Sequence, residues 1–144
     1  MIEPDTIRLL RECDAGIRMG ISSIEDILPR VENDAFREKM SRCKAEHEKL
    51  EREVRRELDR YQDEGKAPSK MAQGMSAAKT GVMFAMDATD ETAASLITDG
   101  CNMGVKSLNQ YLNEYEAADD RSKDIAKRLI HLEEQLATDI RAYL

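Results

Sequence analysis

The sequence contains an internal repeat. The segment Gly16-Ile-Arg-Met-Gly-Ile-Ser-Ser-Ile24 returns 84 residues later as Gly100-Cys-Asn-Met-Gly-Val-Lys-Ser-Leu108. Both copies keep a Gly-x-x-x-Gly pair, and both lie within apolar residues spaced three and four apart, which is the spacing of an amphipathic helix. Because repeats of this kind mark duplicated structural units, we expect two corresponding helices in the two halves of the chain.

The composition favours an all-α protein. Of the 144 residues, 35% are charged and only 4% are aromatic, and the chain has three prolines and no tryptophan. This balance is typical of long helices with solvated outer faces. The length suits one domain with one core, so we expect residues 1–144 to form a single unit.

Apolar spacing predicts four helices, at about 5–28, 34–61, 90–117 and 120–144. Asn33 or Asp34 is the predicted N-cap of the second helix, and Asp90 that of the third. Short links follow the first and third helices, so the chain should form two antiparallel hairpins, over 5–62 and 90–144.

The link 63–89 is long enough to cross the bundle from end to end, which would let the second and third helices run parallel. Within it, helical spacing predicts a short amphipathic helix along Met71, Met75, Ala78 and Val82. This helix would cover the bundle or a dimer contact, or it would offer an adaptable, methionine-lined binding surface.

Two short-looped hairpins, a long crossover and the sequence echo between the first and third helices together resemble the ferritin-like superfamily. The segment Thr98-Asp-Gly-Cys-Asn-Met-Gly-Val-Lys-Ser-Leu-Asn-Gln-Tyr-Leu112 resembles a helix of this type, and the chain is most similar to small bacterial ferritin-like domains. The resemblance implies a four-helix bundle. It also implies a dinuclear iron or manganese site, held by a carboxylate from each of two helices and a Glu-x-x-His pair from each of the others.

The chain departs from this metal-binding pattern at both histidines. Lys44 precedes His47 by three residues and Arg128 precedes His131 by three, so a cation stands where the family places a carboxylate. Because a metal pair needs negative charge around it, we expect the dinuclear site to be degenerate. We also expect His131 to lie on the surface.

Several polar residues fall near one predicted cross-section of the bundle. Folding each hairpin about its loop brings together Asp14, His47, Thr98 and Gln135, with Cys101 at a similar height. An isolated buried carboxylate is costly, so Asp14 should pair with His47. Such a layer would fix the register of the helices, or it would bind a single metal ion or a small polar ligand.

The two Gly-x-x-x-Gly pairs also have two interpretations. Each glycine weakens a helix by about 1 kcal/mol relative to alanine, so the loss of the side chain should serve a purpose. Either the backbones approach closely at Gly16, Gly20, Gly100 and Gly104, or the missing side chains leave a cleft for a small ligand.

The charge and the cysteines exclude several functions. A formal net charge of −7 disfavours binding to nucleic acid or to anionic membranes. Neither a signal-like N-terminus nor an apolar run of about 18 residues is visible, so a cytoplasmic location is expected.

Cys13, Cys43 and Cys101 lack metal-site spacing and should be reduced, and no catalytic nucleophile arrangement stands out.

Two functions remain open from the sequence. The first is a non-enzymatic bundle that acts by association, as a homo-oligomer such as a dimer, or by binding a small ligand. The alternative is a redox or storage protein that binds iron or manganese through an altered site of Asp14, His47, Asp99 and Glu134.

Overall fold

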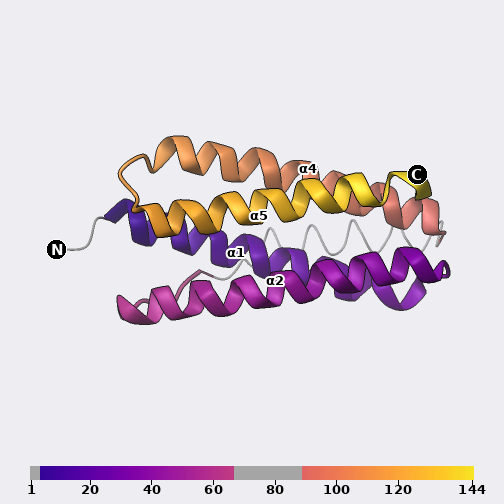
Figure 1. Ribbon diagram of the computed structural model, residues 1–144, viewed down its shortest axis with the longest axis horizontal. Coiled ribbons are helices and arrows are strands. Elements are labelled where there is room, and N and C mark those ends of the chain that lie inside the picture. Colours follow the sequence, from indigo (N-terminus) through magenta and orange to yellow (C-terminus); the bar gives the residue numbers. More distant parts are fainter. Residues whose placement is uncertain (1–3, 67–88) are drawn as a thin grey trace.

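The computed structural model describes residues 4–66 and 89–144, which form a bundle of four long helices (Figure 1). The helices are α1 (Pro4–Ile27), α2 (Asp34–Arg60), α4 (Asp90–Glu114) and α5 (Asp120–Asp139). Short 3₁₀ turns, η1 (Leu28–Arg30) and η2 (Arg141–Tyr143), follow α1 and α5. These parts of the chain contain no strand, so the all-α prediction is confirmed. The amphipathic helix expected along Met71 to Val82 lies outside the described residues.

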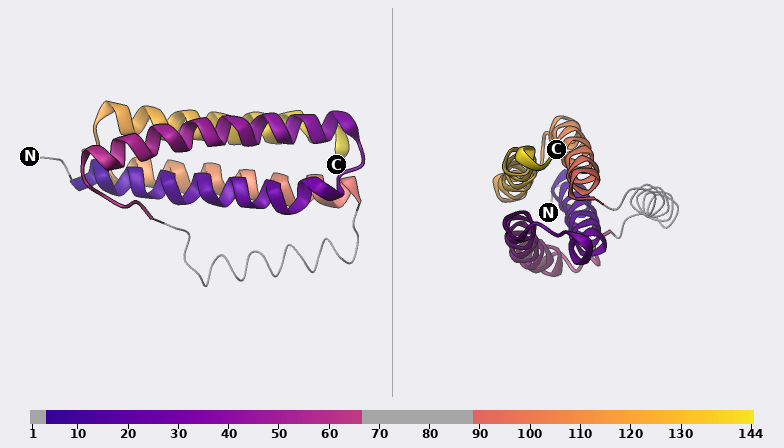
Figure 2. Two further views of the ribbon diagram at one scale, coloured as in Figure 1. Left: turned by 90° about the horizontal axis from the view of Figure 1, so that it is seen from below. Right: turned by 90° about the vertical axis from the view of Figure 1, so that its right-hand side faces the viewer.

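The helices pack as two antiparallel pairs. In the end-on view α1 and α4 lie on one side of the bundle and α2 and α5 on the other (Figure 2). α1 packs against α2 and α4, and α5 packs against the same two helices from the opposite corner. α2 ends at the end of the bundle where α1 begins, whereas α4 begins at the opposite end (Figure 1). α2 and α4 therefore run in the same direction.

Local side-chain caps set where the helices begin. Asn33 caps α2 by accepting a hydrogen bond from the backbone N–H of Phe36 at 3.0 Å, as predicted. The predicted cap at Asp90 is wrong, because Thr89 caps α4. The Asp90 carboxylate instead accepts bonds from the backbone N–H groups of Glu32 and Asn33, each at 2.9 Å. Asp90 thus ties the α1–α2 loop to the start of α4.

The interior consists of two apolar clusters stacked along the bundle axis. The first includes Leu9, Leu10, Ile17, Leu50, Val54, Leu58, Ile125 and Leu129. The second includes Ile24, Ile27, Phe36, Met40, Cys43, Ala94, Leu136 and Ile140. His47 on α2 and Glu133 on α5 fall between the two sets in their helices, so polar side chains occupy the level where the clusters meet.

Replacing Asp90 by alanine should lower the free energy of unfolding by about 1 kcal/mol, because two backbone donors of the α1–α2 loop lose a charged acceptor. Chemical denaturation measures this change. Glu91→Ala, at the neighbouring exposed position, is the control and should have little effect. Equal losses in the two variants would show that the tie to the loop contributes nothing.

Candidate functional site

A buried ion pair crosses the centre of the bundle between His47 and Glu133. The His47 side chain is 1% exposed. Its Nδ1 lies 2.8 Å from the carbonyl oxygen of Cys43, and its Nε2 lies 3.0 Å from Oε1 of Glu133. Both ring nitrogens therefore face acceptors, an arrangement that the imidazolium satisfies by donating twice. Burial lowers the pKa of His47, but the interactions with Cys43 and Glu133 outweigh it and raise the pKa to about 10.

Two thiols border this ion pair. The Cys43 Sγ lies 3.5 Å from the His47 Nδ1, and Cys101 approaches Glu133 from α4. Burial, and then the charge of Glu133, raise the pKa of Cys101 far above its usual range. Cys13 is also buried, and burial raises its pKa to about 12. All three cysteines are free and buried, and Cys13 and Cys101 are poor nucleophiles because a protonated thiol does not attack.

The second glycine of each repeated pair lies beside the ion pair, and Gly20 makes room for it. A Cβ atom on Gly20 would lie only 3.0 Å from the His47 Nε2, whereas one on Gly104 would make an ordinary contact with the Glu133 Cδ at 3.6 Å. A Cβ on Gly16 would make an ordinary contact with Leu129 at 3.7 Å, and one on Gly100 would meet none of the described residues within 4 Å. The space beside Gly20 and Gly104 is thus occupied by side chains of the fold.

Asp14 forms the second buried charged group, on the flank between α1 and α2. The side chain has no exposed surface. Its two oxygens each lie 3.1 Å from Nη2 of Arg55, Oδ1 lies 3.2 Å from Nε of Arg18, and Oδ2 accepts the backbone N–H of Lys66 at 2.9 Å. The predicted pairing of Asp14 with His47 is wrong, because Asp14 pairs with arginine side chains and His47 pairs with Glu133.

Glu51 lies beside Asp14 in the same cluster. Its Oε1 is 3.5 Å from Arg18 and 3.6 Å from Arg55, while Oε2 is buried without a hydrogen-bond partner among the described residues. Burial, and then the interaction with Asp14, raise the pKa of Glu51 to about 7. Near neutral pH Glu51 is therefore protonated in part of the molecules, so the cluster does not always contain two carboxylate anions.

The chain leaving α2 closes over this cluster. Nη1 of Arg55 donates to the carbonyl oxygen of Glu64 at 2.6 Å. Gly65 has a φ of 84°, which favours glycine, and a Cβ there would clash with Oδ2 of Asp14. The Asp14 cluster therefore fixes the first residues after α2 against α1.

The other members of the predicted polar layer do not join these groups. The Thr98 hydroxyl is buried but has no hydrogen-bond partner in the described part of the chain, and Gln135 is exposed and donates to Asp139 at 2.9 Å. Gln135 lies two residues after Glu133, so it points about 200° away around the helix. The predicted layer is therefore wrong, since equal height along the bundle does not imply the same direction around a helix.

The four residues of the predicted altered metal site lie apart. Asp14 and His47 belong to different buried clusters, while Asp99 and Glu134 are exposed on α4 and α5. Over residues 4–66 and 89–144, no group of three or more His, Cys, Asp or Glu side chains could hold one metal ion. The residues present do not fit the dinuclear site that the resemblance implies.

The cations at the two altered Glu-x-x-His positions point outward. Lys44 lies 3.3 Å from Glu25, and Arg128 donates twice to Glu53 at 2.8 Å. His131 is exposed, as predicted. These three side chains thus belong to the surface and leave the interior to the His47 pair.

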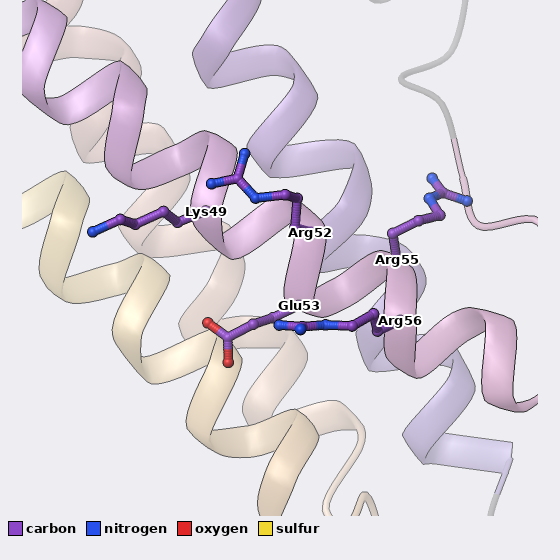
Figure 3. A pocket seen from close by; sticks show the side chains of 5 residues that line it. All are labelled: Lys49, Arg52, Glu53, Arg55 and Arg56. Atoms are coloured by element: carbon purple, nitrogen blue, oxygen red, sulfur yellow. The ribbon is translucent and has the colours of Figure 1, made fainter.

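An open hollow on the outer face of α2 is lined by Lys49, Arg52, Glu53, Arg55 and Arg56 (Figure 3). Lys49, Arg52 and Arg55 point in different directions, whereas Arg56 extends toward Glu53 (Figure 3). Glu53 is held by Arg128, and Arg55 is held by Asp14. The hollow therefore lacks a convergent set of donors and is a solvated, charged helix face.

Sequence reasoning missed Glu133, although a signal for it was present. Glu133 follows Leu129 by four residues and precedes Leu136 by three, so it continues the apolar stripe of α5. Arg55 gave no such signal, because it lies in a stretch where charge alternates as on any solvated helix. Arg18 did give one, because it follows Asp14 by four residues, the spacing of an ion pair along one helix face.

Comparison of the chain with protein-family models, with curated proteins and with solved structures gave no match. Among the described helices, none combines the length and the apolar character that a membrane span requires. The candidate site therefore has to be interpreted from its own geometry.

Stability should fall as the pH rises from about 6.5 to about 10. The folded state holds the His47 proton up to a pKa of about 10, whereas the unfolded chain releases it near 6.5, so the contribution of the pair is complete below 6.5 and is lost through 10. Chemical denaturation across this range measures the slope. His47→Gln should flatten it, and an unchanged slope in that variant would contradict the assignment.

The glycines provide a matched pair of substitutions. Gly20→Ala should destabilise the protein, because its methyl group presses on the His47 ring, whereas Gly100→Ala should stabilise a folded monomer by up to about 1 kcal/mol through helix propensity. Thermal unfolding of both variants at low protein concentration tests this. Equal shifts would show that Gly20 is not needed by the ion pair.

Proposed function

We propose that this chain is a ferritin-like bundle that acts by associating with another protein molecule, and that its dinuclear metal site is degenerate. The arrangement of the helices supports the ferritin-like assignment. Two antiparallel pairs with α2 and α4 parallel (Figure 1) match the helix directions of bundles that have one long crossover connection.

The observation that carries the proposal is that the interior charges are neutralised by the chain's own side chains. Asp14 faces two guanidinium groups, and both nitrogens of His47 are used by acceptors. A metal ligand must offer a free lone pair, and the imidazolium of His47 offers none. Loading a metal here would require the loss of a stabilised proton and the separation of Asp14 from Arg18 and Arg55.

Association is favoured over binding of a small ligand. Ligand sites are usually concave and mostly apolar, with a few convergent polar groups. In the part of the chain that the structure describes, the hollow on α2 is open and lined by charges that diverge. The alternative, an iron or manganese protein with an altered site, needs a rearrangement of both buried clusters.

Metal analysis tests the proposal directly. Protein purified from cells grown with added iron and manganese should carry far less than one equivalent of either metal, and it should associate as its concentration rises in sedimentation experiments. Stoichiometric metal that is lost in both Asp14→Asn and His47→Gln, but retained in Glu134→Gln, would overturn the proposal in favour of a site at the buried clusters.

A further inference from the structure

The outer side of α4 carries little charge. Between Ser95 and Asn113 only Asp99 and Lys106 are charged, whereas 35% of the whole chain is charged. In the middle of this stretch Met103 is 70% exposed, the largest value among the exposed large apolar side chains of the described residues. Depletion of charge around an exposed methionine is typical of the centre of protein interfaces.

Gly100 has no explanation among the residues that the structure describes. Gly20 makes room for the His47 ring and Gly104 lies beside Glu133, but a Cβ on Gly100 would meet none of these described residues within 4 Å, and the position is exposed. An exposed glycine inside a helix costs about 1 kcal/mol relative to alanine. Gly100 lies one turn before Met103, so the helix presents a notch beside a projecting apolar side chain.

The two charges of this face are complementary to each other. Asp99 and Lys106 are exposed, and neither forms an ion pair or hydrogen bond with the residues that the structure describes. They lie four residues before and three residues after Met103. A face that carries one acid and one base on either side of its centre is self-complementary when a second copy lies antiparallel.

We propose that this face of α4, defined by Asp99, Gly100, Met103 and Lys106, is the contact with a second copy of the chain across a two-fold axis. A rise of about 1.5 Å per residue fixes the register. When an antiparallel partner brings Met103 to the height of Gly100 of the partner subunit, Asp99 lies about 3 Å along the axis from Lys106 of the partner subunit. In this arrangement Met103 packs into the notch at Gly100 of the partner subunit, and both ion pairs form at the same time.

This inference rests on the proposed function, because it names the partner with which the bundle associates. Sedimentation equilibrium over a wide concentration range tests it through charge exchange. Asp99→Lys and Lys106→Asp should each raise the dimer dissociation constant about tenfold or more, because two symmetric attractive pairs become repulsive. The double exchange, Asp99→Lys with Lys106→Asp, should restore the dissociation constant, and Asp26→Lys on the exposed face of α1 is the matched control.

Met103→Glu supplies a second variant and should abolish the dimer, while its circular dichroism and thermal unfolding at low concentration report whether the monomer still folds. A wild-type dimer that responds to none of these changes would overturn the α4 contact and leave association intact. A wild-type chain that stays monomeric at all concentrations would overturn the α4 contact and would also remove self-association from the proposed function.

Discussion

The ion pair between His47 and Glu133 is the constraint to which the centre of the bundle is fitted. A buried charge without its partner is strongly destabilising, so α2 and α5 are held in the one register that joins these two side chains. The other two helices pack against the pair, because Gly20 on α1 leaves space for the His47 ring and Gly104 on α4 lies beside Glu133. All four helices thus meet at one level, between two apolar clusters that would tolerate small shifts along the axis by themselves.

The Asp14 cluster restricts the positions of α1 and α2 on the flank of the bundle in a comparable way. Arg18 and Arg55 enter from the surface of α1 and α2 with long side chains, and the backbone after α2 completes the site at Lys66. Charge is therefore balanced within each cluster separately. Because neither cluster leaves a carboxylate surplus at the centre, the interior stabilises and orients the helices and lacks the negative field that would attract a metal ion.

The helices could be predicted from the sequence because their signals are local. Apolar spacing and the Asn33 cap act within a few residues, and short links force neighbouring helices to be antiparallel. The pairing of charges could not be predicted in the same way. Folding the first hairpin placed Asp14 near the height of His47, whereas its actual neighbours Glu51 and Arg55 lie about one and two turns further along α2. The ion-pair partners of Asp14 depend on the direction in which each side chain leaves its helix and on the length of the arginine side chains.

The structure explains the repeated glycines only in part, and the unexplained glycine, Gly100, is exposed on α4. Gly20 and Gly104 correspond in the two copies and both lie beside the central ion pair, but only Gly20 is required by it, because a Cβ on Gly104 would make an ordinary contact with Glu133. Gly16 packs beside Leu129, whereas a Cβ on its counterpart Gly100 would meet none of the described residues. Because Gly100 weakens its helix without relieving a contact among those residues, a contact with a second copy of the chain would explain it, which makes the surface of α4, and not the polar interior, the part of this molecule where function should be sought.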